Sequence, residues 1–209
     1  MQTKLVQYGC GLDAPLGWMN FDASPTLRMQ QWPLVKNWAK RRVAFPDAVQ
    51  FGDIVKGLPI AEASVNAVYC SHVLEHLSLS ELELALKNTC RILAPGGVFR
   101  LVLPDLKDLV NSYNNDESPE AAIRFMRNTG MATEVRATGI RGFILDWLGN
   151  SRHLWLWDYA SLKMYLENAG FVDVRRAQFG DSEYKEFETV EKEDRWLGSL
   201  GIECFCPKD

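Results

Sequence analysis

Residues 91–106 read RILAPGGVFRLVLPDL, and this stretch decides the fold class. The breaker residues at 95–97 end a helical pattern, and the nearly continuous apolar run at 98–103 follows them. A strand without polar alternation is typical of a sheet covered on both faces, as parallel α/β sheets are. Asp105 follows where this strand ends. We therefore expect a buried parallel strand with an acidic residue at its carboxyl end.

Upstream of this stretch, short apolar runs bounded by turn residues predict further strands. They lie at 4–8, 18–22, 49–53 and 65–71. The sequence SELE at 80–83 has the spacing of a capping box and predicts the start of a helix there. The stretch at 26–42 has helical spacing that Pro33 must kink or split.

Downstream, Asp158 and Gly170 bracket a helix as its N-cap and the residue after its C-cap. Two last strands, at 172–179 and 201–206, are joined by a non-helical acidic segment, which favours an antiparallel pair at one sheet edge. The stretch 112–160 differs in composition and is interpreted as an insertion with short helices. We expect one α/β domain over residues 1–209 with a mostly parallel, Rossmann-like sheet.

Composition narrows the classes of protein that remain. The chain has 209 residues, 47% of them hydrophobic, and a net charge of −4, which argues against a nucleic-acid partner. No apolar run approaches the ~18 residues that a membrane span needs. Five scattered cysteines do not suggest a disulfide framework, so we expect a reduced, cytoplasmic protein.

Polar and glycine residues gather at the predicted carboxyl ends of the strands, where ligands bind in open α/β sheets. They are Gly9–Cys10–Gly11, Asp22, Asp53, Ser71, His72 and Asp105. Glycines allow close approach to the backbone, and separate carboxylates can accept hydrogen bonds from a diol and an amine. This combination suits a nucleoside.

These residues stand in motifs that resemble the class I S-adenosylmethionine-dependent methyltransferases, in their type 11 subgroup. The matching stretches are LVQYGCG (5–11), WMNFDAS (18–24), GDIVKGLPIAEASVNAVYCSHVLEHL (52–77), RILAPGGVFRLVLPDL (91–106) and LENAGFVDV (166–174). The resemblance implies a sheet whose last strand runs antiparallel and S-adenosylmethionine as cofactor. It implies these cofactor contacts: Gly9, Cys10 and Gly11 with the methionine part, Asp22 with the ribose, Asp53 and Ile54 with adenine, and Ser71 and His72 near the transferable methyl.

One departure from the family concerns the first crossover. Only six residues separate Gly11 from Trp18, too few for the usual crossover of a dozen or more, so we expect the first helix to be shortened or absent. A parallel pairing is still within reach of extended chain. What is lost is a helix N-terminus facing the cofactor's carboxylate. We expect weaker cofactor binding, or a substitute from 26–42.

The three histidines leave alternatives open. His72 is the candidate general base, and a hydrogen-bonded structural role is the alternative. The H-x-x-E-H pattern at 72–76 favours helix packing by Glu75 and His76, with a metal site formed by His72, Glu75 and His76 as the alternative. His153 is then a distant additional ligand.

The resulting hypothesis is a methyltransferase that acts on an oxygen or nitrogen nucleophile of a small molecule or a glycan. Residues 112–160 are expected to form a lid that selects the acceptor, with Asp105, His153 and Trp157 as acceptor-binding residues. The alternatives are a catalytically inactive binding module with the same fold and a metal-assisted O-methyltransferase. The sequence does not indicate an oligomeric state.

Overall fold

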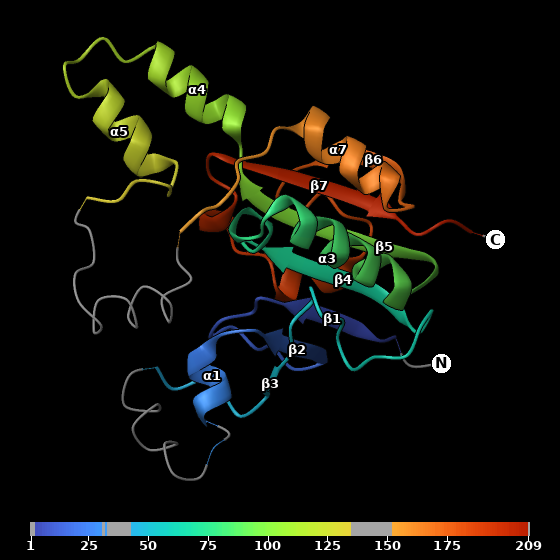
Figure 1. Ribbon diagram of the computed structural model, residues 1–209. Coiled ribbons are helices and arrows are strands. Elements are labelled where there is room, and N and C mark those ends of the chain that lie inside the picture. The colour runs from blue at the N-terminus through green and yellow to red at the C-terminus, as the bar shows by residue number, and fades with distance from the viewer. Residues whose placement is uncertain (1–2, 31, 33–42, 135–151, 209) are drawn as a thin grey trace.

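Seven strands form one sheet in the order β3-β2-β1-β4-β5-β7-β6 in the computed structural model, which describes residues 3–30, 32, 43–134 and 152–208 (Figure 1). The strands are β1 Leu5–Tyr8, β2 Trp18–Asp22, β3 Val49–Phe51, β4 Val65–Ser71, β5 Leu93–Pro104, β6 Val172–Ala177 and β7 Ser199–Phe205. Neighbouring strands from β3 to β5 pair parallel, and β7 runs antiparallel to both β5 and β6. The predicted sheet, with its antiparallel pair at one edge, is confirmed.

The helices of the described residues are α1 Pro25–Gln30, α3 Leu79–Ile92, α4 Leu106–Asn114, α5 Ala121–Asn128 and α7 Tyr159–Asn168. Asp158 caps α7 as predicted, because its carboxylate accepts a 2.9 Å hydrogen bond from the Ser161 backbone N–H. Gly170 follows the C-cap with φ +101°, a conformation that favours glycine. Most of the predicted helical stretch 26–42 lies outside the described residues.

The predicted capping box of α3 is wrong by two residues. Ser78, and not Ser80, is the N-cap, and Glu81 is the residue that reaches back to it at 2.9 Å. Two S-x-x-E patterns overlap at 78–83, so local spacing cannot choose between them. The chain leaves β4 through the short helix η1 (Leu74–His76) and is extended at Leu77, which makes Ser78 the first residue able to cap.

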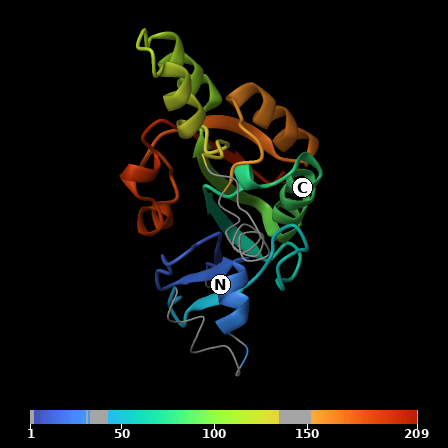
Figure 2. The ribbon, with the colours of Figure 1, turned by 60° about the vertical axis from the view of Figure 1, so that its left-hand side comes forward.

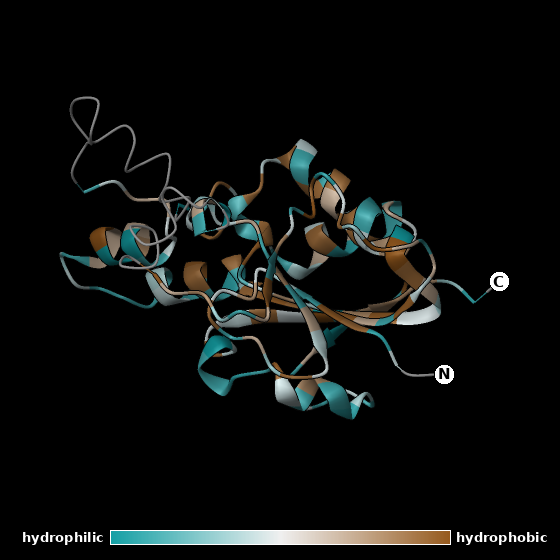
Figure 3. Cartoon of the chain, turned by 90° about the horizontal axis from the view of Figure 1, so that it is seen from below, coloured by the Kyte–Doolittle hydropathy of each residue, from teal (hydrophilic) through white to brown (hydrophobic). Residues whose placement is uncertain are grey.

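One face of the sheet is covered by α3 and α7, as Figures 2 and 3 show. The apolar side of α3 contributes Leu82 and Leu86, and α7 contributes Leu162 and Leu166, all with no exposed area. They belong to one buried cluster that includes side chains of the central strands. Burial at roughly 25 cal/mol per Å² makes this layer the main apolar contribution to stability.

The opposite face is covered by the segment 178–198, which joins β6 to β7 and contains two short 3₁₀ helices, η2 Lys185–Thr189 and η3 Glu193–Arg195. Phe187 and Val190 are buried against side chains of β1, β2, β4 and β5. The indole Nε1 of Trp18 donates a 2.8 Å hydrogen bond to Thr189 Oγ1. We call the segment 178–198 the β6–β7 link. It covers this face of the sheet in place of a layer of helices.

Such a cover is needed because the first crossover contains no helix. β1 and β2 pair parallel, with Leu5 opposite Trp18, yet residues 9–17 between them form only turns and irregular chain. The absence of the first crossover helix, predicted from spacing, is confirmed.

Arg100 fixes the link to the sheet. Its side chain has no exposed area, and its guanidinium contacts Glu191 at 2.5 Å, Asp181 at 2.9 Å and Glu203 at 3.0 Å. Arg100 also donates to the Gln178 carbonyl oxygen at 2.6 Å. Burial alone would lower the pKa of this guanidinium, but Glu191, together with Glu203 and Asp181, raises it through hydrogen bonds and negative charge.

The stretch that follows β5 projects away from the sheet as α4 and α5 (Figure 1). The last residues of α4 and all of α5 belong to the segment 112–160 interpreted as an insertion, of which residues 135–151 lie outside the described residues. Among the described residues, no helix has the length and apolar character to cross a membrane.

We expect Arg100→Met to lower the free energy of unfolding by about 3–5 kcal/mol, because it leaves Glu191 buried without its cation, whereas Glu203 keeps Arg175 at 2.6 Å. Urea denaturation followed by circular dichroism measures the change. Arg91→Met is the matched control, since Arg91 pairs with exposed Glu62 at 3.4 Å and its loss should cost less than about 1 kcal/mol. Equal losses in the two variants would contradict the assigned role of Arg100.

Candidate functional site

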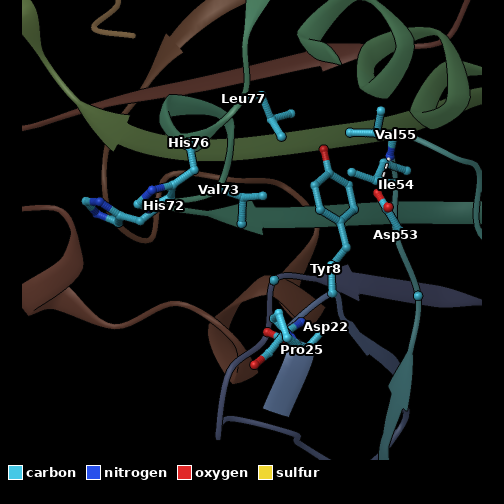
Figure 4. Close-up of a pocket in the computed structure, with 14 residues that line it drawn as sticks. Tyr8, Asp22, Pro25, Asp53, Ile54, Val55, His72, Val73, His76 and Leu77 are labelled. Carbon is cyan, nitrogen blue, oxygen red and sulfur yellow. Dashed lines mark hydrogen bonds between the residues drawn. The ribbon is translucent and has the colours of Figure 1, made fainter. Parts of the chain in front are cut away.

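The carboxyl ends of β1 to β4 surround a cavity of about 260 Å³. Figure 4 shows Asp22 and Pro25 below the Tyr8 side chain, Asp53 and Ile54 on one side, and His72 and His76 on the other. The full lining is Tyr8, Gly9, Asp22, Ala23, Ser24, Pro25, Gly52, Asp53, Ile54, Val55, His72, Val73, His76 and Leu77. Segments far apart in the sequence therefore meet at the strand ends, as open α/β sheets predict.

A second cavity, of about 320 Å³, shares Gly9 with the first. Its lining is Gln7, Gly9, Cys10, Gly11, Leu12, Asp13, Tyr69, Ser71, Val190, Lys192 and Arg195. The predicted cofactor-binding residues are thus divided between two adjoining cavities. Gly9 lines both of them, whereas Cys10 and Gly11 line the second.

Gly9 is required by two independent features of the backbone. Its φ of +68° lies in the left-handed region, and a Cβ built there would lie 2.0 Å from Val73 Cγ2. Gly11 has φ +57° with open space around it. The first glycine therefore allows η1 and its neighbouring residues to approach the end of β1 closely.

Asp22 ties the helix-free crossover to the end of β2. Its Oδ2 accepts a 2.9 Å hydrogen bond from the Gly11 N–H, and its Oδ1 accepts one of 2.8 Å from the Ser24 N–H. Each carboxylate oxygen keeps a further lone pair. Asp22 therefore holds the glycine bend in place and also presents acceptor capacity to the first cavity.

Cys10 contributes to this bend through its backbone, because its N–H donates to the Phe21 carbonyl oxygen at 3.2 Å. Burial, with the nearby charge of Asp22, raises the pKa of the Cys10 thiol to about 12. The thiol is therefore protonated at neutral pH, and a nucleophilic or metal-binding role does not fit it.

Asp53 lines the first cavity on the side away from His72 and His76 (Figure 4). Its Oδ1 accepts a 3.0 Å hydrogen bond from the Val55 N–H, and its Oδ2 lies 2.5 Å from Lys56 Nζ. Ile54 is buried beside it. The structure thus brings the two predicted acids to one cavity, each with its orientation fixed by the backbone.

His72 follows β4 in a left-handed conformation, with φ +52°, which is rare for a residue with a side chain. Its Nε2 lies 3.0 Å from the Arg195 carbonyl oxygen and its Nδ1 lies 3.2 Å from Glu75 Oε1. Both ring nitrogens therefore face acceptors. His72 lines the first cavity, whereas Ser71 lines the second.

Two cationic side chains beside the glycine bend, Lys192 and Arg195, could not be predicted from local sequence patterns. Lys192 and Arg195 come from the β6–β7 link and line the second cavity. Lys192 Nζ lies 2.8 Å from Asp13 Oδ2, and Arg195 donates to Ser71 Oγ at 3.3 Å. They bring positive charge to the glycine bend, where a crossover helix would point its N-terminus. The sequence predicts either weaker cofactor binding or a substitute from 26–42, and these two residues lie outside that stretch.

The predicted acceptor-binding residues are placed differently. Asp105 caps α4, accepting a 2.9 Å hydrogen bond from the Lys107 N–H, and lies 3.4 Å from Arg176. Trp157 is fully buried in the main apolar cluster. His153 lies beside Glu75, with Nε2 3.9 Å from Oε1. None of the three lines either cavity described above.

Comparison with known proteins finds a family match within the chain. Residues 6–101, from β1 into β5, match the family described as "Methyltransferase domain", type 11. This match relates the part of the chain from β1 into β5 to the methyltransferases. The matched range contains the glycine bend, both cavity acids, His72 and the end of β4. No curated protein matches the sequence of the chain.

Solved structures share the methyltransferase fold at low sequence identity. A SAM-dependent methyltransferase from Archaeoglobus fulgidus is 16% identical with a TM-score of 0.51, the alignment covering 97% of this chain and 86% of that one. A SAM-dependent methyltransferase from Thermotoga maritima is 20% identical, with a TM-score of 0.50 and coverage of 99% and 82%. An N-methyltransferase from Haemonchus contortus, in complex with S-adenosylhomocysteine, is 11% identical, with a TM-score of 0.50 and coverage of 99% and 50%.

The glycine bend of this methyltransferase domain allows a matched test. We expect Gly9→Ala to destabilise the protein by more than Gly17→Ala, because both positions have positive φ but only Gly9 has a side chain, Val73, in the way. A left-handed alanine costs about 1–2 kcal/mol, and overpacking adds about 1–3 kcal/mol. Chemical denaturation measures both variants.

The double variant Gly9→Ala/Val73→Ala checks the cause, since removing Val73 Cγ2 relieves the contact. A coupling energy of at least about 1 kcal/mol is expected between the two positions. Strict additivity would show that Val73 does not restrict this position.

Proposed function

We propose that the protein transfers a methyl group from S-adenosylmethionine to an oxygen or nitrogen nucleophile of a small molecule or glycan. The observation that carries the proposal is the shared lining of one cavity by Gly9, Asp22 and Asp53. A diol and an exocyclic amine are the groups that two separate carboxylates would bind. The family match and the related methyltransferase structures support the same reaction class.

The residues present fit the cofactor in parts. Asp22 has free acceptor capacity for ribose hydroxyls, and Asp53 with Ile54 offers an acceptor beside an apolar surface for adenine. Apart from its chain neighbours, no atom of the described residues lies within 4 Å of the place where a Cβ of Gly11 would stand, so the backbone of the bend can approach a ligand there. Lys192 and Arg195 supply the positive charge that a carboxylate needs.

The bound cofactor supplies an activated methyl group, since its sulfonium already makes the sulfur a good leaving group. The chain's own contribution is to hold the acceptor in line with that methyl group, and such positioning is worth on the order of 7–11 kcal/mol. Val73 and Leu77 add apolar side chains to the lining of the cavity.

His72 is the residue we propose to take the acceptor's proton when the acceptor is a hydroxyl. It lies at the end of β4 and lines the first cavity. In this role Nε2 would exchange its contact with the Arg195 carbonyl oxygen for the acceptor hydroxyl, while Nδ1 stays directed at the Glu75 carboxylate, 3.2 Å away. A base in this position contributes about 10²–10⁴-fold to the rate.

The acceptor is proposed to enter beneath the segment 112–160, whose described parts include α5 and the residues around His153 and Trp157. Asp105 and Trp157 would contribute to acceptor binding by shaping the base of that segment, because they pair as an isolated parallel bridge.

The location that we propose for the protein is the cytoplasm. All five cysteines are free thiols, which supports a reducing compartment.

Calorimetric titration with S-adenosylmethionine tests the proposal. We expect binding at micromolar to millimolar concentration and a loss of more than about 1 kcal/mol in Asp22→Asn, because a charge-assisted hydrogen bond is removed. Asp108→Asn, at an exposed residue of α4, is the control and should bind as the wild type does. Absence of binding up to millimolar cofactor would leave only an inactive binding module with this fold.

The role of His72 is tested with His72→Asn, because asparagine tolerates the left-handed backbone at this position. A panel of sugar, phenol and amine acceptors is screened by release of S-adenosylhomocysteine. For a hydroxyl acceptor we expect a loss of about 10²–10⁴-fold in kcat that shrinks as pH rises, since the ionised acceptor needs no base. A variant with the wild-type pH profile would remove His72 from catalysis.

A further inference from the structure

All three histidines of the chain lie around one carboxylate, that of Glu75. The Glu75 side chain has no exposed area. Ligand atoms of Glu75, His76 and His153 all lie within 4.8 Å of one another, and the rings of His76 and His153 meet edge to face at 4.9 Å between centroids. His72 approaches the same carboxylate from the side of β4.

The hydrogen bonds of the His76 and His153 rings determine where their lone pairs point. His76 Nδ1 lies 2.9 Å from the Arg152 carbonyl oxygen, and His153 Nδ1 lies 2.7 Å from that of Thr129. A carbonyl oxygen only accepts, so each Nδ1 carries the hydrogen and each Nε2 of the neutral ring carries a lone pair. This is the arrangement by which metal-binding histidines are usually oriented.

Glu75 lacks a partner that would explain its burial. Neither of its oxygens receives a well-directed hydrogen bond from the residues that the structure describes, although His72 Nδ1 lies 3.2 Å away. A buried carboxylate that faces imidazole lone pairs is electrostatically unfavourable unless a cation lies between them. The arrangement calls for a bound cation or for added protons.

We infer that Glu75, His76 and His153 bind a divalent transition-metal ion, with Zn²⁺ as the ion that suits them best. Two imidazole nitrogens and one carboxylate are a ligand set that zinc uses where one coordination position stays open for water or substrate. Magnesium and calcium prefer oxygen ligands throughout, which this cluster does not provide.

Two segments of the fold carry the ligands of this cluster, and a third packs against one of them. Glu75 and His76 stand on η1, and the backbone carbonyl of Glu75 accepts hydrogen bonds from Leu154 N–H at 2.7 Å and Trp155 N–H at 3.1 Å. The end of α5 supplies Gly130, where a Cβ would lie 2.4 Å from His153 Nδ1. His153 is thus held against Glu75 from both sides.

The site would act on the acceptor, an extension that rests on the proposed function. His76 belongs both to the ligand cluster and to the lining of the first cavity. An ion held by His76 therefore lies beside the space that an acceptor must occupy. Because such an ion binds oxygen and lowers the pKa of a coordinated hydroxyl, the favoured acceptors are hydroxyl compounds, and amines are disfavoured.

Zinc binding is measured on tag-free protein stripped with a chelator, by calorimetric titration with ZnCl₂ and by elemental analysis after dialysis. We expect one ion per chain and a higher Tm with zinc. Glu75→Gln and His153→Gln should each weaken binding by at least about 100-fold, whereas the exposed Glu83→Gln on α3 should bind as the wild type does. Cobalt(II) in place of zinc should show the absorption of a low-coordinate nitrogen and oxygen site.

Stability without metal separates a metal site from a protonated cluster. If a metal site is present, chelator-treated Glu75→Gln should unfold at the temperature of the stripped wild type or above it, because an unpaired buried charge has been removed. Failure to bind zinc, zinc binding that persists in both ligand variants, or a Tm of stripped Glu75→Gln well below that of the stripped wild type would overturn the site. The zinc titration contains no S-adenosylmethionine and the cofactor titration contains chelator, so each proposal fails on its own.

Discussion

A buried positive charge in the middle of the sheet organises this molecule. Arg100 lies on β5, between β4 and β7, and takes its counter-charges from the β6–β7 link and from β7 itself. Leaving those carboxylates or the guanidinium unpaired would be very unfavourable, so the link is bound to one position. That position lays Phe187 and Trp196 over the sheet, with Trp196 stacked on the guanidinium at 4.8 Å. The same link carries Lys192 and Arg195 to the glycine bend.

The short β1–β2 crossover explains why this link matters. A parallel connection without a helix leaves one face of β1 and β2 bare and leaves the glycine bend without a helix N-terminus. The link covers the face and supplies cations at the bend, while Asp22 fixes the bend by accepting the Gly11 N–H. One carboxylate therefore combines a structural and a ligand-binding function. The site depends on contacts between the two ends of the chain.

Local patterns in the sequence predict the parts of this structure that depend on local chemistry. The apolar runs, the Asp158 cap and the spacing after Gly11 are each contained in a dozen residues, and each prediction is confirmed. The overlapping serine–glutamate patterns at 78–83 show the limit, because the exit of the chain from β4 decides which of them caps α3.

Electrostatic contacts between residues that are far apart in the sequence could not be predicted from local patterns. In the sequence Arg100 is a single interruption of an apolar strand, and its carboxylate partners lie 81, 91 and 103 residues away. Lys192 and Arg195 look like part of a solvated acidic segment. Likewise, nothing near His153 in the sequence indicates that its ring packs against that of His76, because the contact forms only when residues 152–157 fold back onto η1.

The position of the covering link near the end of the chain has a consequence for biosynthesis. Strands β1 to β5 leave the ribosome well before residues 178–198 are translated, and translation adds only about 5–20 residues per second. For several seconds the nascent sheet has α3 on one side and an open apolar surface, with the uncompensated guanidinium of Arg100, on the other. The growing polypeptide is thus exposed to aggregation at this stage, and a holding chaperone that shields the open surface would matter more here than for relatives whose N-terminal half covers itself.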